Sequence, residues 1–310
     1  MGEHIPVLLS EAIEALDIKE GGTYVDLTLG RGGHSKEILK RLGSGKLYCF
    51  DQDETAIKEG GENLKGLGNF EIIKANFSEF ALELRSRGVD QVDGILADLG
   101  VSSPQFDDPE RGFSYRVDAK LDMRMDRSSP LTAEEVVNSY PLERLAKIIS
   151  DYGEDKDAYS IAKQIVRRRE NNPIHTTFEL VEAIKAGKSP KSLRQKGHPA
   201  KQTFQAIRIE VNHEKQSLEE MLEAFPEMLR PGGRIAIITF MSLDDRIVKR
   251  KFASLTTIEG NRSTLPMLPG EEGVAPFEKI YRKPILPSEQ ELEANHRAAS
   301  AKLRAIKKKD

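Results

Sequence analysis

The first hundred residues alternate between short β-rich runs and stretches in which apolar residues recur with helical spacing. The β-rich runs predict strands at 23–28, 46–51, 70–74 and 92–98. Helices are predicted between them, after residue 33, at 53–64 and at 78–87. Strands that alternate with helices in this way are typical of βαβ units and a parallel sheet. The pattern therefore predicts an α/β fold.

This alternation ends after residue 98. Residues 99–130 are rich in Gly, Pro, Ser and Asp and are predicted to form a long loop, which is usually functional when it lies inside a compact domain. From 131 to 186 the pattern is helical without convincing strands, and 187–200 are predicted to be a linker.

The α/β pattern returns in the last third of the chain. A helix is predicted up to residue 229, followed by a strongly apolar strand at 234–240, a further strand at 277–281 and a C-terminal helix from about residue 288. The simplest organisation is one α/β domain in two parts, interrupted by a helical insertion. The expected ranges are 1–127 and 200–310 for the domain and 128–199 for the insertion.

The composition narrows the classes of protein to consider. Its 310 residues suffice for a substantial core, and 47 Lys and Arg against 50 Asp and Glu give a net charge of −3, which by itself says nothing about nucleic acid. A single cysteine excludes a disulfide framework, and no residues show metal-ligand spacing, so no metal is expected. With neither a signal peptide nor a run long enough to cross a bilayer, we expect a cytoplasmic protein without a membrane partner.

A glycine loop, Gly30-Arg-Gly-Gly33, lies between the first predicted strand and its helix. Glycines there let the backbone approach a ligand closely, although the same composition also suits a simple turn. Asp51 follows 21 residues after Gly30 and ends the second strand, where a carboxylate can accept the hydroxyls of a ribose. Alternatively, Asp51 only caps the next helix.

Two residues indicate which nucleoside cofactor this loop would bind. Ser35 stands where a dinucleotide fingerprint has its third glycine. Asp26 ends the first strand, and an acid followed by such a loop resembles the S-adenosylmethionine-dependent methyltransferases. Methyl transfer is therefore favoured over hydride transfer, with a dinucleotide-dependent oxidoreductase as the competing class.

Longer motifs are more specific. They are Gly30-Arg-Gly-Gly-His-Ser35, Asp98-Leu-Gly-Val-Ser-Ser-Pro-Gln105, Glu110-Arg-Gly-Phe-Ser114, Leu121-Asp-Met-Arg-Met-Asp126, His198-Pro-Ala-Lys-Gln-Thr-Phe-Gln-Ala-Ile-Arg208 and Ser300-Ala-Lys-Leu-Arg304. With these motifs the chain resembles, from about His4 to Arg304, the bacterial ribosomal RNA cytosine-N4 methyltransferase family (RsmH, also called MraW). The resemblance implies a Rossmann-like class I methyltransferase with a helical insertion that uses S-adenosylmethionine. It also implies methylation of N4 of a cytidine in the decoding centre of 16S rRNA, with the small ribosomal subunit as partner.

The resemblance also implies which residues contact the cofactor. Carried over one by one, they are Gly32, Gly33, His34, Asp51, Phe77, Asp98 and Gln105. The loop amides would meet the methionine end of the cofactor, Asp51 the ribose and Phe77 a face of the adenine. From the sequence alone, Phe77 is better explained as a core residue and His34 as a polar residue at a helix start.

The chemistry requires a hydrogen-bond acceptor beside the amino group, because the N4 lone pair of cytosine is delocalised into its ring. Asp98, at the carboxyl end of the fourth strand, is the candidate, and Ser102 and Ser103 in the following turn are predicted to assist it. The alternative is that Asp98 contacts only the cofactor. Met241 stands where the family pattern has His, which keeps open a catalytically impaired assembly factor that binds rRNA.

Access to the base edge of a cytidine requires an unstacked nucleotide, so aromatic and basic residues are candidate RNA contacts. The candidates are Phe106, Arg111, Phe113, Arg124, Lys196 and Lys201. Two segments, 185–201 and 297–309, carry several Lys and Arg residues and no acid, although such runs are often only solvated surface. The sequence does not decide between a monomer and a homodimer.

Overall fold

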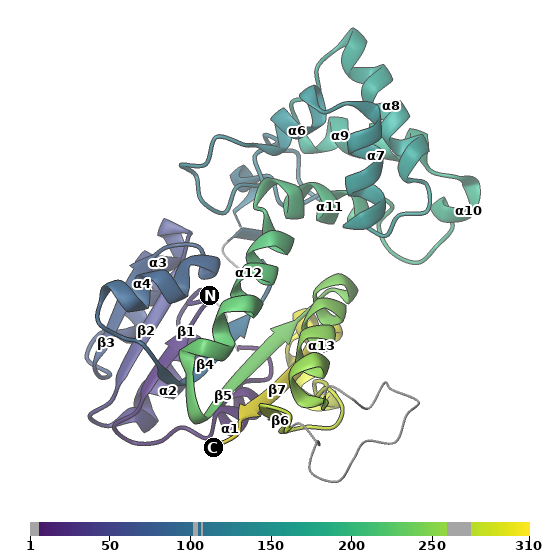
Figure 1. The fold of residues 1–310 in the computed structure, drawn as a ribbon. Coiled ribbons are helices and arrows are strands. Elements are labelled where there is room, and N and C mark those ends of the chain that lie inside the picture. The colour runs from purple at the N-terminus through teal and green to yellow at the C-terminus, as the bar shows by residue number, and fades with distance from the viewer. Residues whose placement is uncertain (1–5, 102–104, 107, 259–273) are drawn as a thin grey trace, which may run out of the picture. The chain divides into compact units, whose positions relative to one another are not determined.

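The computed structural model describes residues 6–101, 105, 106, 108–258 and 274–310. They form two compact units, which are described separately (Figure 1). One, the α/β unit, comprises residues 1–100 and 217–310, and the other, the helical unit, comprises residues 101–216.

A seven-stranded sheet forms the centre of the α/β unit. Its strands are β1 (Thr23–Asp26), β2 (Lys46–Asp51), β3 (Phe70–Lys74), β4 (Val92–Asp98), β5 (Leu229–Thr239), β6 (Phe277–Lys279) and β7 (Lys302–Lys308). The order is β3-β2-β1-β4-β5-β7-β6, and the first five strands are parallel whereas β7 is antiparallel to both of its neighbours. The predicted α/β fold is therefore confirmed. The carboxyl ends of β1, β2 and β4 meet at one edge of this sheet.

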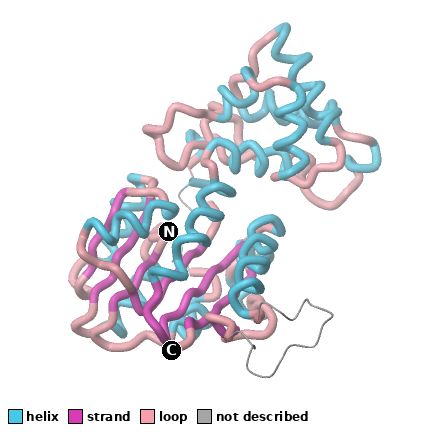
Figure 2. The backbone as a smooth tube through the Cα atoms, in the orientation of Figure 1, coloured by secondary structure: helices cyan, strands magenta, loops and turns pink. Residues whose placement is uncertain are grey.

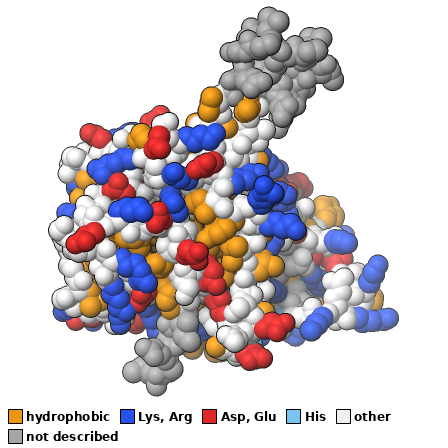
Figure 3. All heavy atoms as spheres, turned by 90° about the horizontal axis from the view of Figure 1, so that it is seen from below, with side chains coloured by type: hydrophobic (Ala, Val, Ile, Leu, Met, Phe, Trp, Pro, Cys, Tyr) orange, Lys and Arg blue, Asp and Glu red, His pale blue; other side chains and the backbone are white. Residues whose placement is uncertain are grey.

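Helices cover both faces of the sheet (Figure 2). They are α1 (Leu9–Leu16), α2 (Gly33–Leu42), α3 (Glu54–Leu64), η1 (Phe77–Glu79), α4 (Phe80–Ser86), α12 (Glu214–Met228), α13 (Ser242–Thr256), α14 (Glu289–Ala294) and η3 (His296–Ser300). Successive strand residues alternate between two cores: Val25 and Phe50 pack in one, and Tyr24 and Cys49 in the other. None of the helices described is long and apolar enough to cross a membrane. Acidic and basic side chains are interspersed on the face drawn in Figure 3.

The helical unit has its own hydrophobic core. Its elements are η2 (Pro109–Arg111), α6 (Ala133–Ser139), α7 (Leu142–Asp151), α8 (Ala158–Asn171), α9 (Thr177–Gly187), α10 (Pro190–Leu193) and α11 (Lys201–Val211). The unit extends beyond the expected insertion at 128–199 on both sides. Phe113, Leu121 and Met123 from the predicted loop pack into this core, and so do Phe204 and Ile207 of α11. Burial of these apolar side chains attaches both flanking segments to the helical unit.

The C-terminal region differs from the predicted helix. Only the short α14 and η3 are helical, and the chain then forms β7 between β5 and β6. The basic side chains of β7 have partners within the unit: Arg304 Nε lies 2.7 Å from Asp245 Oδ1, and Lys302 Nζ lies 3.2 Å from Asp245 Oδ2. Lys308 Nζ donates to two backbone carbonyls at 2.7 Å. Much of the second basic segment, 297–309, is thus part of the sheet's own structure.

Candidate active site

The glycine loop lies between the end of β1 and the start of α2, as predicted. Gly30 and Gly32 have φ values of +51° and +77°, a conformation that favours glycine. A Cβ atom on Gly33 would come within 2.2 Å of Pro6 Cγ, so this position also has no room for a side chain. The loop therefore presents bare backbone at the carboxyl edge of the sheet.

Asp51 ends β2 and is joined to this loop. Its Oδ2 accepts the Gly30 N–H and its Oδ1 accepts the Asp53 N–H, both at 2.9 Å. The cap of helix α3 is Asp53, whose side chain accepts the Thr55 N–H, so the alternative that Asp51 only caps this helix is wrong. Burial raises the pKa of Asp51 to about 6, against the two backbone hydrogen bonds, which lower it. Each Asp51 oxygen has capacity for a further donor such as a ribose hydroxyl.

Asp26, at the end of β1, organises the same edge of the sheet. Its side chain is buried, its Oδ2 accepts the Ser35 hydroxyl at 2.6 Å, and its Oδ1 accepts the Thr28 N–H at 3.0 Å. The Thr28 hydroxyl in turn accepts the backbone N–H of Asp98 at 2.7 Å. Ser35, which departs from a dinucleotide fingerprint, is thus needed to hold Asp26. Hydrogen bonds connect the ends of β1 and β4 and the start of α2.

Asp98 ends β4 and faces His34 at the start of α2. Asp98 Oδ2 lies 3.8 Å from His34 Nδ1, while Asp98 Oδ1 is buried and has no hydrogen-bond partner among the described residues. The side chain keeps 25% of its surface exposed. Burial raises the pKa of Asp98 to about 6. His34 lowers this pKa, whereas the negative charge of Asp26 raises it further. A carboxylate with an unused acceptor is what a hydrogen-bond donor of a substrate or cofactor requires.

His34 is held in one orientation by the segment before α1. Its Nε2 lies 3.1 Å from the carbonyl oxygen of Val7. Because a carbonyl can only accept, Nε2 carries a proton and Nδ1 is the atom that faces Asp98. The imidazole is buried, so its orientation relative to the carboxylate is fixed by packing as well as by this bond.

Phe77 follows β3 and begins η1. It is partly buried and packs against one core of the sheet, so the core interpretation accounts for at least part of its surface. Two polar residues beside it were not identified from the sequence. Asn76 caps η1, and its Nδ2 donates to Gln52 Oε1 at 3.1 Å. Their position directly after β3 and β2 is the signal that could have identified them.

The remaining predicted site residues belong to the helical unit. Gln105 is buried, and Phe106 is 44% exposed. Ser102 and Ser103 lie outside the described residues, so their predicted catalytic role stays a prediction. Lys196 and Lys201 are exposed, as an RNA contact requires.

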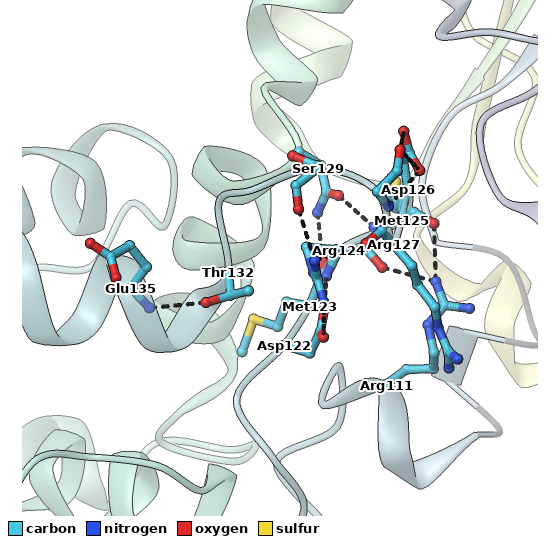
Figure 4. Close-up of polar contacts among 12 residues, drawn as sticks. Arg111, Asp122, Met123, Arg124, Met125, Asp126, Arg127, Ser129, Thr132 and Glu135 are labelled. Atoms are coloured by element: carbon cyan, nitrogen blue, oxygen red, sulfur yellow. Dashed lines mark hydrogen bonds and ion pairs between the residues drawn. The ribbon is translucent and has the colours of Figure 1, made fainter.

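Three of the predicted RNA contacts have structural roles. Arg111 is 2% exposed, and its Nη2 donates to the carbonyls of Arg124 and Met125 at 2.8 and 3.1 Å. Arg124 forms two hydrogen bonds with the carboxylate of Asp122, from Nε at 2.9 Å and Nη2 at 2.8 Å (Figure 4). Phe113 is 4% exposed within the core of the helical unit. These side chains hold the segment between β4 and α6. Arg111 and Phe113 expose almost no surface that RNA could contact, whereas the RNA contact of the partly exposed Arg124 stays a prediction.

The chain is similar to proteins of one family along its whole length. It matches the model described as the MraW methylase family over residues 1–309. Ribosomal RNA small subunit methyltransferase H from Streptococcus dysgalactiae subsp. equisimilis is 53% identical over 309 residues, which cover 98% of this chain and 97% of the relative.

Solved structures of low sequence identity also match. An rRNA methylase from Streptococcus thermophilus is 12% identical with a TM-score of 0.45, and 100% of each chain is covered. A putative methyltransferase from Streptococcus mutans in complex with SAH is 12% identical with a TM-score of 0.43, covering 98% of this chain and 99% of that one.

The family match decides between the competing classes of enzyme. The oxidoreductase hypothesis is rejected, and the expected class I methyltransferase fold with an inserted helical part is confirmed. The glycine loop and the two carboxylates at the carboxyl edge of the sheet suit S-adenosylmethionine as the methyl donor. The chain belongs to the MraW methylase family and is an S-adenosylmethionine-dependent methyltransferase.

Proposed function

We propose that this methyltransferase acts on 16S rRNA in the cytoplasm and methylates N4 of a cytidine in the decoding centre, with the small ribosomal subunit as its partner. The name of the 53% identical relative supports ribosomal RNA of the small subunit as the substrate. The observation that carries the N4 assignment is the buried Oδ1 of Asp98, which has no hydrogen-bond partner among the residues that the structure describes, because an amino group offers hydrogens that such an acceptor can bind.

The proposed cofactor contacts follow from the geometry of the loop and its neighbours. The loop carries no side chains at Gly32 and Gly33, so its backbone amides can meet the methionine end, and the Asp51 carboxylate accepts the ribose hydroxyls. Phe77 offers a partly buried ring beside the ends of β2 and β3 for the adenine. We propose His34, Asp98 and Gln105 as the other cofactor contacts.

The reaction requires alignment of the N4 amino group with the methyl group and a hydrogen-bond acceptor for that amino group, and it needs no covalent intermediate with the enzyme. S-adenosylmethionine supplies a methyl group already activated by its sulfonium. Asp98, ionised above its pKa of about 6, accepts a hydrogen of the N4 amino group and stabilises the positive charge that develops on nitrogen. His34 Nδ1 lies 3.8 Å from the carboxylate, and Thr28 fixes the backbone of Asp98 through a 2.7 Å hydrogen bond. That Ser102 and Ser103 assist Asp98 in catalysis stays a prediction.

The departure at Met241 gives no support to a catalytically impaired protein. Met241 is the N-cap residue of α13, and its carbonyl accepts the Asp245 N–H at 3.1 Å, a contact that any residue can provide. The site carboxylates Asp26, Asp51 and Asp98 are in place at the edge of the sheet. We therefore propose an active enzyme in which the helical unit recognises RNA.

A methyl-transfer assay tests this function. The wild-type protein is incubated with tritiated S-adenosylmethionine and small ribosomal subunits that lack the modification, and the nucleosides are then identified by mass spectrometry. We expect N4-methylated cytidine at one decoding-centre position. Naked 16S rRNA, assayed in parallel, separates the two forms of the substrate. Label at another atom of cytidine, or no label in either substrate, would contradict the proposal.

A further inference from the structure

Two aromatic rings are stacked at the surface of the helical unit. Tyr115, from the segment before α6, lies parallel to His198, which precedes α11, with ring centroids 4.3 Å apart and an angle of 11° between the planes. Phe204 of α11 packs edge-on against Tyr115 at 5.7 Å. Tyr115 and His198 are partly exposed, whereas Phe204 is buried, so the pair has an accessible side and a firm support.

The orientation of His198 is fixed by the chain that follows it. The backbone N–H of Ala200 donates to His198 Nδ1 at 3.2 Å, so in the neutral ring the proton is on Nε2. Burial lowers the pKa of His198, and the positive charges of Lys185 and Arg116 lower it further. The stack is therefore a neutral aromatic surface at pH 7 with two cations beside it.

The two charges that act on His198 are positive. Lys185 and Arg116 are exposed, and the chain has no acidic residue between Glu182 and Glu210. Glu182 pairs with Lys185 at 3.0 Å in an exposed contact, and such pairs contribute little and break readily. The exposed Lys196 and Lys201 flank His198 in the sequence.

We propose that the Tyr115–His198 stack binds an unpaired base of the rRNA substrate, and that Arg116 and Lys185 bind the phosphates next to that base. Every nucleobase has a face that stacks on an aromatic ring, and Lys and Arg beside it match the adjacent backbone charge. The inference rests on the proposed function, because it names where this substrate docks on the helical unit. The neutral His198 favours stacking with a base over pairing with a carboxylate.

Binding of a fluorescein-labelled RNA oligonucleotide with the decoding-region sequence tests the proposal by fluorescence anisotropy. We expect His198→Ala to weaken binding about tenfold, the order typical of one lost stacking contact. His198→Phe, which keeps a flat ring, is expected to bind within about twofold of wild type. Arg116→Ala and Lys185→Ala should each reduce the slope of log affinity against log salt by about 1.

His175→Ala is the matched control, since His175 is 59% exposed in the same unit and pairs with Glu134 at 2.8 Å. It should bind RNA like wild type. If His198→Ala binds as tightly as His175→Ala, or if the two cation variants keep the full salt slope, the docking site is refuted. Affinity for S-adenosylmethionine and methylation by the wild type are measured in the same series. If the wild type neither binds S-adenosylmethionine nor methylates the RNA, the proposed function is refuted instead. The two results distinguish a wrong docking site from a wrong function.

Discussion

A buried ion pair of the helical unit and the buried carboxylates at the carboxyl edge of the sheet have different surroundings. In the helical unit, the buried Lys188 and Asp155 neutralise each other: they lie 2.7 Å apart with side chains 5% and 1% exposed. At the carboxyl edge of the sheet, burial instead raises the pKa of Asp51 and Asp98 to about 6, and Asp98 Oδ1 has no partner among the described residues. A buried charge with an ion-pair partner has a structural role. A buried carboxylate whose pKa is raised because it lacks such a partner is a candidate for binding or catalysis.

The largest effect should come from removing the charge of Asp98. We expect Asp98→Asn to lower the rate of methyl transfer by about 100- to 1,000-fold, the range typical for loss of one well-placed electrostatic contact. A single-turnover assay at saturating cofactor and rRNA measures the rate. Cofactor affinity, measured by calorimetry, separates the two roles of Asp98. A normal rate in this variant would show that Asp98 is not the acceptor.

Removing one partner of the buried ion pair in the helical unit should change stability rather than activity. Asp155→Asn leaves Lys188 as an uncompensated buried cation, and we expect it to reduce the free energy of unfolding by about 3–5 kcal/mol. Urea denaturation of the full chain, followed by circular dichroism, measures this change. Replacing both residues by apolar ones should recover part of the loss. An Asp155→Asn protein as stable as wild type would remove the contrast between the units.

The stability of the α/β unit should depend on pH through Asp98. Its pKa is about 6 in the folded protein and near 3.8 when unfolded, so the unfolded chain loses its proton first and stability falls as pH rises from about 4 to 6. Asp98→Asn is therefore expected to increase the free energy of unfolding by up to about 3 kcal/mol near pH 8 and by little near pH 4. Thermal denaturation at the two pH values checks this. Equal stabilisation at both would contradict it.

The smallest effect concerns the backbone of the glycine loop. Gly32→Ala places a Cβ at φ +77°, within 3.3 Å of Leu64, and should weaken S-adenosylmethionine binding about tenfold. Gly88→Ala is the matched control, because its φ is +76° and nothing lies within 4 Å of the position that its Cβ would occupy. Both variants should lose about 1 kcal/mol of stability. Calorimetric titration measures the affinity for S-adenosylmethionine. Equal affinity in the two variants would contradict the proposal that the glycine loop binds the cofactor.

Much of the α/β unit could be predicted from the sequence. The strands at 46–51, 70–74 and 92–98 agree with β2, β3 and β4, because buried parallel strands carry continuous apolar runs that end at turn residues. The positions of the glycine loop and of Asp51 and Asp98 followed from those strand ends. These are local signals, and local signals are what a single sequence contains.

The rest depended on partners far away in the chain. Strand β7 carries Lys302, Arg304 and Lys308, and in the sequence these basic residues suggest a solvent-exposed helix. Their contacts with Asp245 and with backbone carbonyls near β5 are visible only in the structure. Arg111 looked like an RNA contact because its acceptors are backbone carbonyls, which have no signature in the sequence. Tyr115 and His198 are far apart in the chain, so their stacking could not be predicted from spacing.

The most direct test of the account is the pH dependence of single-turnover methyl transfer to small ribosomal subunits that lack the modification. We expect the wild-type rate to rise about tenfold per pH unit below an apparent pKa of about 6 and to level off above it, as Asp98 loses its proton. Asp98→Asn should be slow at every pH. A wild-type rate that stays constant from about pH 5 to 8, or a variant that follows the wild-type profile, would contradict the account.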